Sequence, residues 1–349
     1  MTSDELRAVD RSGMHDRLMH FPDQVREAVA IGRGASFPWK ARGTDAIVLC
    51  GLGGSAIAGD LLRSYLAADL AVPFLVNRTY TLPAFVGPRT LVIISSYSGN
   101  TEETNAAQRE ALRRRARILC ITSGGSTAAL ARKRRTPLIL VPGGSPPRAA
   151  LGYAFFPLFI ALSSMGFISD RRRDIAETIR QLEERAAEYG DPSRATNAAL
   201  LLARQFQGRI GVIYSSAERF DSVNTRWRGQ IAENAKTLVF GNVLPEMNHN
   251  ELVGWKVLRE QMREIQVLFL RDKGDHPRVQ ARMEITRGVI GTHTPHVAEC
   301  WSRGTSLLAR MFSLIVLGDW VSYYLAILHG EDPTPVEVID RLKRELANL

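Results

Sequence analysis

Short apolar runs alternate with segments of helical periodicity along the first half of the chain. Strand-like runs lie at 45–50, 73–77, 91–95, 117–121 and 137–141, and helical patterns lie at 55–67, 101–115, 126–133 and 151–167. Strands that alternate with helices in this way predict a parallel sheet with helices on both of its faces.

The second half of the chain repeats this alternation more loosely. Its helical patterns lie at 195–206, 222–236 and 305–328, and its strand-like runs at 209–214, 238–240, 265–270 and 286–290. Between the halves, a highly charged helical pattern at 170–189 ends at Gly190-Asp191-Pro192, a typical helix stop. We therefore predict an α/β chain with an N-terminal domain and leading helix at 1–169, a linker helix at 170–194, a second domain at 195–330 and a final helical segment at 331–349.

The last segment of the chain has clear helix signals. Thr334-Pro335-Val336-Glu337 fits a capping box with proline at the first helical position, and the pattern predicts a helix that runs to about Leu346. Val336, Ile339 and Leu346 have helical spacing, and Lys343 falls on the same stripe. We therefore expect Lys343 to lie in an inward-facing seam of this helix.

The composition is that of an ordinary globular protein with a positive charge. The 349 residues include 45 Lys and Arg against 36 Asp and Glu, which gives a net charge of +9, and 45% of the residues are hydrophobic. The runs 113–115, 132–135 and 171–173 are basic but contain no interleaved aromatic residues. We interpret these runs as solvated helix faces or turns. We expect no nucleic-acid partner, and a mild attraction for anionic substrates.

Cysteine use indicates a reducing compartment, and the hydropathy of the chain bears on whether it enters a membrane. Cys50, Cys120 and Cys300 are odd in number and widely spaced, which argues against a disulfide framework. Residues 149–168 carry no charge over a membrane-spanning length, but glycine, proline and serine interrupt them. We interpret that segment as a buried helix. Because the N-terminus lacks a signal-peptide core, we expect a cytoplasmic protein without a membrane partner.

A glycine-rich turn follows the first strand-like run. Gly51-Leu52-Gly53-Gly54-Ser55-Ala56 leads into a helical pattern, so its amides can bind an anion at a helix N-terminus. Gly51, Gly53 and Ala56 fit the dinucleotide pattern G-x-G-x-x-A. The same turn can equally hold a single sugar phosphate, so the turn alone leaves both interpretations open.

A second, hydroxyl-rich turn, Ser96-Tyr97-Ser98-Gly99-Asn100-Thr101, follows the strand-like run at 91–95. Turns after neighbouring parallel strands open at the same edge of a sheet, so the two turns together favour a phosphate cradle. A dinucleotide site would need an acidic residue after the next strand, where this chain has Asn77-Arg78. Since Arg78 could accept a 2′-phosphate, an NADP-dependent oxidoreductase remains the weaker alternative.

The two turns resemble the phosphosugar-binding site of sugar isomerase (SIS) domains. The segments 226–236, 244–255 and 332–343 narrow the resemblance to the bifunctional phosphoglucose/phosphomannose isomerase family, and the likeness extends from about Asp10 to the C-terminus. Its more specific parts are Glu233-Asn-Ala-Lys236 and Asn248-His249-Asn250-Glu251. The resemblance implies two tandem SIS domains, each a parallel sheet flanked by helices in an α-β-α sandwich.

The resemblance also implies an activity and a site. The activity is an aldose–ketose isomerisation of glucose 6-phosphate or mannose 6-phosphate to fructose 6-phosphate through a cis-enediol, without a cofactor. The resemblance assigns proton transfer to Glu233, ring opening to His249 and Lys343, and stabilisation of the enediolate to Arg148. It assigns the substrate phosphate to Gly54, Ser55, Ser96, Ser98 and Thr101.

Members of this family are homodimers with the active site at the subunit interface. The resemblance therefore implies a homodimer in which His249 could serve the neighbouring subunit's site. Without the family resemblance, Glu233 would be interpreted as an exposed carboxylate paired with Lys236. His249 and Arg148 would then be interpreted as surface residues. The same phosphate loops would also suit a non-catalytic regulator that binds phosphosugars.

One further group of residues has metal-like spacing. His293 and His296 are followed by Glu299, a set of side chains that can bind zinc. Pro295 disfavours a helical pair of histidines, and no further ligand cluster is evident in the sequence. We therefore expect no metal site.

Overall fold

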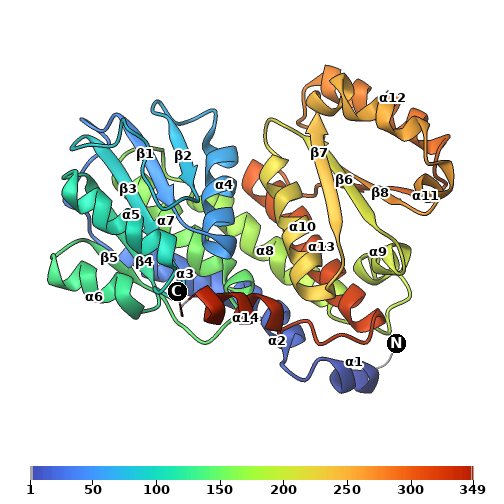
Figure 1. The fold of residues 1–349 in the computed structure, drawn as a ribbon, viewed down its shortest axis with the longest axis horizontal. Helices are drawn as coiled ribbons and strands as arrows, with labels where there is room; N and C mark the ends of the chain where they lie inside the picture. Colours follow the sequence, from blue (N-terminus) through green and yellow to red (C-terminus); the bar gives the residue numbers. More distant parts are fainter. Residues whose placement is uncertain (1–2, 347, 349) are drawn as a thin grey trace. The chain divides into compact units, whose positions relative to one another are not determined.

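The computed structural model describes residues 3–346 and 348 and divides the chain into two compact units (Figure 1). The first-sheet unit comprises His20–Arg180 with Ser306–Leu308. The second-sheet unit comprises the residues up to Met19, Gln181–Thr305 and Ala309–Leu349. Each unit is built around one parallel sheet with helices packed against it, which confirms the predicted α/β class.

The first-sheet unit has five parallel strands in the order β2-β1-β3-β4-β5. The strands are β1 (Ala46–Cys50), β2 (Phe74–Asn77), β3 (Thr90–Ser95), β4 (Arg117–Thr122) and β5 (Leu138–Leu140). The helices are α3 (Phe21–Gly34), α4 (Gly53–Leu66), α5 (Glu102–Arg113), α6 (Gly125–Lys133), the 3-10 helix η1 (Pro147–Ala149), α7 (Leu151–Ser164) and α8 (Arg172–Tyr189), which continues into the second-sheet unit. The elements expected in this half are all present, with ends shifted by a few residues.

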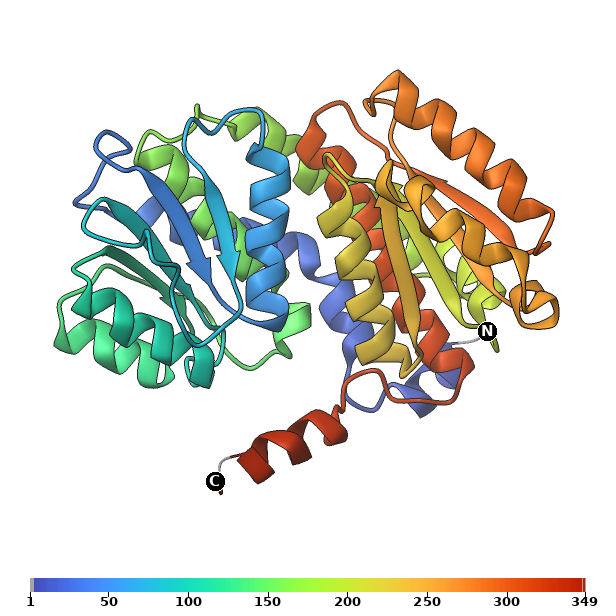
Figure 2. The same cartoon turned by 45° about the horizontal axis from the view of Figure 1, so that its top comes forward.

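Alternate residues of the first sheet face two helix layers. Val48 and Cys120 belong to a buried cluster with Ala107 of α5, so α5 and α6 cover this face of the sheet. On the other face, Gly59 of α4 approaches Leu49 so closely that a Cβ at position 59 would lie 2.8 Å from the leucine side chain. Helix α7 packs against α3 and α4, and Figure 2 shows the same layers from a second direction.

The second-sheet unit has four parallel strands in the order β7-β6-β8-β9. The strands are β6 (Gly211–Ser216), β7 (Val239–Leu244), β8 (Gln266–Arg271) and β9 (Val297–Trp301). The helices are α1 (Ser3–Val9), α2 (Met14–Met19), α9 (Ala198–Phe206), α10 (Asp221–Ala235), η2 (Glu246–His249), η3 (Glu251–Lys256), α11 (Arg259–Arg263), α12 (Pro277–Gly291), α13 (Leu307–Leu328) and α14 (Glu337–Leu346).

The expected strand at 286–290 is wrong, because these residues form the end of α12. Their β-branched residues favour a strand, but Val279, Met283 and Ile290 are buried at helical spacing against the sheet. The fourth strand of the sheet is instead β9, at an edge, which the sequence analysis missed. Residues of β9 are only half-buried, so its apolar pattern is weak.

The last helix, α14, differs from its expected form in two ways. It begins at Glu337 rather than at Pro335, and the Thr334 amide donates to Asp332 Oδ1 at 2.9 Å in the turn before it. The residues of its predicted apolar stripe are not buried, since Ile339 is 40% and Leu346 is 49% exposed. The expected inward-facing seam is therefore wrong for this helix.

Two apolar helices of the chain are buried within the protein. The uncharged segment at 149–168 forms α7, whose residues are nearly all buried, as expected. Helix α13 is, by length and composition, the one helix among the described residues that could cross a membrane, and 94% of its apolar window is buried inside the protein. Trp320, Tyr323 and Tyr324 of α13 are fully buried, which is typical of a core helix.

The division into compact units differs from the expected segments at the N-terminus, inside α8 and at Ser306–Leu308. Residues up to Met19 pack with the second-sheet unit, where the Asp10 carboxylate accepts the Met14 amide and the His15 ring lies 2.9 Å from the Gly190 carbonyl oxygen. The division between the units also falls inside α8, at Arg180 and Gln181, rather than at its end.

Candidate functional site

The order in which the chain adds strands to the first sheet reverses between β1 and β3. The chain proceeds from β1 to β2 on one side and then crosses to β3 on the other, and Cys50 of β1 pairs with Ile94 of β3 near their carboxyl ends. In open parallel sheets, ligands bind outside the carboxyl ends of the strands at this switch point. The two predicted phosphate turns follow β1 and β3, so the topology brings them together.

The first turn is tied to the second by Ser55. Ser55 lies in the first turn of α4, is 5% exposed, and its Oγ accepts the Tyr97 amide at 3.1 Å. Because Oγ accepts this bond, the hydroxyl proton remains free to donate to an anion. The positive φ of Gly53, 51°, lets the backbone turn directly from β1 into the helix N-terminus.

The second turn is closed by its own hydroxyl groups. Ser96 Oγ lies 3.0 Å from Thr101 Oγ1 and accepts the Gly99 amide at 3.1 Å. Ser96 is 1% exposed, whereas Ser98 is exposed at the tip of the turn. Ser96 therefore shapes the turn, and Ser98 and Thr101 are the more accessible hydroxyls beside the start of α5.

A third turn, between β4 and α6, supports the second and was missed by the sequence analysis. Asn100 Oδ1 accepts both the amide and the hydroxyl of Ser126, at 3.0 and 3.2 Å. Gly99 has a φ of 71°, and a Cβ at this position would lie 1.9 Å from the Gly124 carbonyl oxygen. The signal was present in the sequence, since Thr122-Ser-Gly-Gly-Ser-Thr127 is rich in serine, threonine and glycine, as the second turn is.

Arg148 lies beside the first turn. It is part of η1 and is 4% exposed, so it is not the surface residue of the alternative interpretation. A Cβ on Gly54 would lie 2.5 Å from the Pro147 carbonyl oxygen, so glycine at position 54 lets η1 pack against the start of α4. Gly54 therefore has a packing role in addition to the predicted role in phosphate binding.

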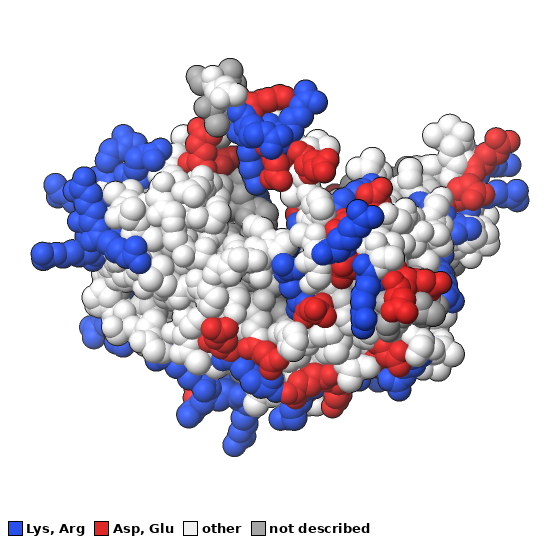
Figure 3. Space-filling model, turned by 90° about the horizontal axis from the view of Figure 1, so that it is seen from below, with Lys and Arg blue, Asp and Glu red and all other residues white. Residues whose placement is uncertain are grey.

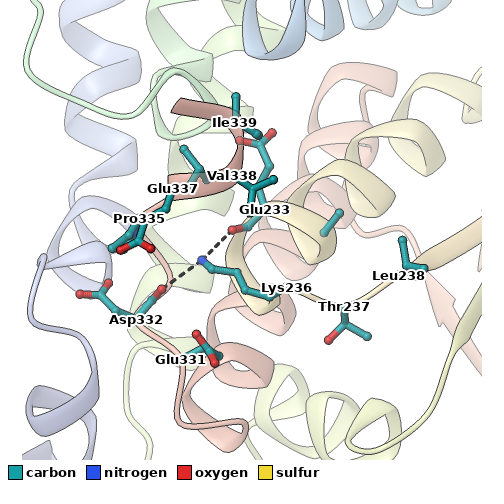
Figure 4. Close-up of a pocket in the computed structure, with 12 residues that line it drawn as sticks. Glu233, Lys236, Thr237, Leu238, Glu331, Asp332, Pro335, Glu337, Val338 and Ile339 are labelled. Carbon is teal, nitrogen blue, oxygen red and sulfur yellow. Dashed lines mark hydrogen bonds between the residues drawn. The ribbon is translucent and has the colours of Figure 1, made fainter. Parts of the chain in front are cut away.

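Glu233 lines a pocket of the second-sheet unit. The pocket has a volume of about 580 Å³ and lies between the end of α10 and the segment Glu331–Ile339 (Figure 4). Glu233 is half-buried, and it comes from the last turns of α10. The carboxylates of Glu331, Asp332 and Glu337 belong to the other side of the pocket.

Lys236 fixes one wall of this pocket. It takes the left-handed conformation at the C-terminus of α10, with a φ of 54°. Its Nζ lies 2.9 Å from the Glu233 carbonyl oxygen and 3.1 Å from that of Asp332 (Figure 4). It also lies 3.3 Å from the Pro333 carbonyl oxygen. The ammonium group thus caps the helix and holds the segment that leads to α14, a role that the sequence analysis did not foresee.

Two other predicted site residues are exposed. His249 ends η2, in the connection that follows β7. The side chain of Lys343 on α14 is 71% exposed, and its Nζ lies 3.9 Å from Asp340 Oδ1. Neither residue lines the pocket beside Glu233 within the second-sheet unit. Their roles in ring opening remain predictions.

The switch point of the second sheet, between β6 and β8, contains carboxylates. Ser216 at the end of β6 donates to Asp275 Oδ1 at 2.6 Å, and Arg310 Nε donates to Asp272 Oδ2 at 2.8 Å. Both aspartates are buried. Burial and the neighbouring charge of Asp272 raise the pKa of Asp275 to about 6, although the bond from Ser216 opposes this rise.

One member of the metal-like group, Glu299, is used in ion pairs. Glu299 on β9 contacts buried Arg271 and lies 3.8 Å from Arg287. Arg271 also pairs with Glu284 at 2.7 Å. Within residues 3–346 and 348, no three His, Cys, Asp or Glu side chains lie together as metal ligands.

Comparison with known proteins identifies the family. Residues 41–142 match the SIS domain, and residues 195–346 match the bacterial phospho-glucose isomerase C-terminal SIS domain. A bifunctional phosphoglucose/phosphomannose isomerase from Caldicellulosiruptor bescii is 41% identical over 96% of this chain and 99% of its own. The protein of that name from Aquifex aeolicus is 37% identical over 86% of this chain and 90% of its own. This chain belongs to the bifunctional phosphoglucose/phosphomannose isomerase family.

The predicted family and the two SIS domains are thus confirmed. A solved glucose-6-phosphate isomerase-like protein from Thermus thermophilus has the same fold, with a TM-score of 0.65 over 96% of this chain and 98% of that one, at 18% identity.

The isomerase-family segment 226–236 is largely structural apart from Glu233. Arg226 pairs with Asp319 of α13 at 2.8 Å, and both side chains are 4% exposed. Gln230 donates to the same carboxylate at 2.8 Å, and Asn234 donates to Ser322 at 2.9 Å. These polar residues recur every four positions along the buried face of α10, so they fix its position against α13 and direct Glu233 to the pocket.

Proposed function

We propose that this protein interconverts glucose 6-phosphate and mannose 6-phosphate with fructose 6-phosphate. The observation that carries the proposal is family membership over nearly the whole chain, together with a half-buried carboxylate at Glu233 beside a pocket. The reaction moves one proton between two neighbouring carbons of the substrate. It therefore needs an acid–base group and charge stabilisation, and no cofactor.

We assign the substrate phosphate to the turns of the first-sheet unit. Ser55, Ser98 and Thr101 would donate hydroxyl protons to it, and Gly54 would contribute main-chain geometry at the start of α4. Ser96 would act in the same site by orienting Thr101. This end of the substrate does not react, so these residues serve as an anchor.

We assign the chemistry to Glu233. Its carboxylate removes the proton from C2 of the open-chain aldose, the C–H electrons form the C1–C2 double bond, and the C1 carbonyl π electrons move to O1, which takes up the proton that the O2 hydroxyl loses. As the C2 carbonyl forms, the double-bond electrons take the proton back from Glu233 at C1 to give the ketose. Arg148 would stabilise the negative charge of the enediolate. His249 and Lys343 would move the proton of the ring oxygen when the sugar ring opens.

We further propose a cytoplasmic homodimer whose active site lies at the subunit interface. The support is the surface around His249, where the large apolar side chains of Val253, Val257 and Leu258 are 79%, 64% and 62% exposed. Exposed apolar groups of this kind are typical of protein interfaces. In such a dimer His249 could contribute to the neighbouring subunit's site.

The proposal is tested by coupled assays of the purified protein with glucose 6-phosphate and mannose 6-phosphate, each with and without a chelator. We expect turnover of both sugars, unaffected by the chelator. Binding of fructose 6-phosphate without turnover of either aldose would contradict the proposal and favour a phosphosugar-binding regulator.

A further inference from the structure

A second hollow of the first-sheet unit lies apart from the phosphate turns. It has a volume of about 790 Å³ and runs along α5 to the end of α6, and we call it the α5–α6 groove. Its half-buried apolar residues are Ala106, Leu112 and Leu130, and the other lining residues are Tyr80, Thr81, Arg109, Glu110, Arg113 and Arg134. This volume is within the roughly 300–1,000 Å³ of small-molecule sites.

Three arginines give the groove a positive charge that its one lining carboxylate, Glu110, compensates only in part. The side chains of Arg109, Arg113 and Arg134 are exposed, and none of these side chains makes a hydrogen bond or close ion pair with any residue that the structure describes. The charge of Arg113 acts on the Glu110 carboxylate at longer range. The carboxylate of Glu110 is already engaged, because it contacts Arg114 and accepts a main-chain amide at 2.9 Å. Guanidinium groups bind phosphate oxygens with paired hydrogen bonds, so the groove suits a ligand with several phosphate charges.

The surface of the first-sheet unit around α6 is basic as well. Figure 3 shows Lys and Arg side chains gathered on the part of the first-sheet unit that carries α6, without acidic side chains beside them. Arg109 and Arg113 are four residues apart on α5, so they lie on one face of the helix, about one turn from each other. Arg134 directly follows the last turn of α6.

Tyr80 gives the groove an aromatic wall. Its side chain is 47% exposed, and its hydroxyl donates to Glu102 Oε2 at 3.3 Å, which fixes the edge of the ring. An exposed aromatic face stacks on a nucleobase. A single aromatic side chain suits one base, whereas a nucleic-acid strand needs several.

We propose that the α5–α6 groove binds a nucleoside polyphosphate. The base lies against Tyr80 and the apolar lining, and the phosphates lie on Arg109, Arg113 and Arg134. This site goes beyond the proposed isomerase function and does not depend on it.

The groove is separate from the phosphosugar turns but connected to them. Helix α5 begins directly after Thr101, and Arg109 lies eight residues further along, which places it about 12 Å from the turn along the helix axis. Tyr80 contacts Glu102, the first residue of the same helix. Both ligands should therefore bind at the same time.

The test is isothermal titration calorimetry of the full-length protein with ATP, inorganic triphosphate and adenosine, at saturating fructose 6-phosphate. We expect ATP to bind one site per chain. The triple variant Arg109→Gln/Arg113→Gln/Arg134→Gln should weaken ATP binding by at least about tenfold, and Tyr80→Ala should weaken binding of ATP but not of triphosphate. The control variant Arg115→Gln/Arg132→Gln/Arg135→Gln loses the same charge from exposed residues that do not line the groove, and should bind ATP as the wild type does.

Four results would overturn the proposal. They are the absence of ATP binding at millimolar concentration, an equal loss of affinity in the control variant, competition between ATP and fructose 6-phosphate, and wild-type ATP affinity in Tyr80→Ala with triphosphate binding as tightly as ATP. Isomerase turnover of each variant is measured in parallel. Failure of the nucleotide site would leave wild-type turnover intact, so it is distinguishable from failure of the proposed function.

Discussion

The two sheets of this protein have the same strand order around their switch points, but different kinds of side chain lie at the two switch points. In the first sheet, the turns after β1 and β3 contain hydroxyl and glycine residues and no carboxylate. In the second sheet, the equivalent position between β6 and β8 is filled by Asp275, which accepts a hydrogen bond from Ser216, with Asp272 beside it. The first sheet edge can therefore accept an external anion such as a phosphate. At the second sheet edge, the carboxylate of Asp275 already occupies the equivalent position.

This difference shows how two units of one fold can have different roles. The first edge keeps donors available for a phosphate, so it is suited to anchor a substrate. The second edge uses its own carboxylates to bind Ser216 and Arg310, and the unit instead offers Glu233 at the far end of α10. The fold alone therefore does not decide the function of a switch point.

The largest effect is expected where the second-sheet unit provides chemistry. Glu233→Gln keeps the size and polarity of the side chain but removes the base, so turnover should fall by about 10²–10⁴. Binding of fructose 6-phosphate, measured by calorimetry, should remain. Glu264→Gln, an exposed position of the same unit, is the control and should have wild-type turnover. Wild-type turnover in Glu233→Gln would contradict the assignment.

The second-largest effect is expected when a carboxylate is introduced at the first sheet edge, so that this edge resembles the second one. Ser55→Asp places a carboxylate where the phosphate should bind, and like charges in contact should weaken fructose 6-phosphate binding by about 100-fold. Ser98→Asp, at an exposed position of the other turn, should act in the same direction. Ser164→Asp adds the same charge at the exposed end of α7 and should not change the affinity. Unchanged affinity in both Ser55→Asp and Ser98→Asp would place the phosphate elsewhere.

A smaller effect is expected from the residue that holds the pocket wall. Lys236→Met keeps the length of the side chain but loses the bonds to the Asp332 and Pro333 carbonyl oxygens. The segment 331–346 should then exchange its amide hydrogens about tenfold faster, because such charged hydrogen bonds contribute about 1.5–3 kcal/mol. Lys236→Arg should retain part of the protection. Unchanged exchange in Lys236→Met would show that the ammonium group does not position this segment.

The smallest effect concerns the carboxylate at the second edge. The pKa of Asp275 is raised to about 6 from about 3.8, so the folded state favours the protonated form, and the stability from this proton is lost as the pH rises through about 6. The shift corresponds to about 3 kcal/mol. Asp275→Asn cannot titrate, so its melting temperature should change less than that of the wild type between pH 4.5 and 7.5, by a few degrees. Equal pH dependence would contradict the raised pKa.

Much of the fold follows from local pattern. The alternation of short β-branched runs with helical periodicity predicts the first sheet and its helices, since its central strands β1, β3 and β4 are buried on both faces. The same reasoning fails at 286–290, where β-branched residues belong to α12 because their neighbours are buried at helical spacing. It also fails at edge strand β9, whose half-burial leaves no clear apolar run.

The site was only partly predictable. Ser55 and Thr101 are recognisable because they follow strands in glycine-rich turns, and topology then brings those turns together. The supporting contacts depend on residues far apart in sequence, as when Ser126 binds Asn100 or when Lys236 binds the carbonyl oxygen of Asp332. No local pattern encodes such pairs. The apolar stripe of α14 is a case in which a local pattern is present but the predicted contact is not. Helical spacing alone did not reveal whether other parts of the chain cover that face of the helix.

The central claim is that Glu233 moves a substrate proton while the first-sheet turns hold the phosphate. Its most direct test is proton NMR of fructose 6-phosphate incubated in D₂O with the wild type and with Glu233→Gln. We expect deuterium at C1 of the ketose and formation of both aldose phosphates with the wild type, and neither with the variant, although the variant still binds the sugar. A wild-type protein that binds fructose 6-phosphate without exchange at C1, or a variant that exchanges as fast as the wild type, would contradict the account.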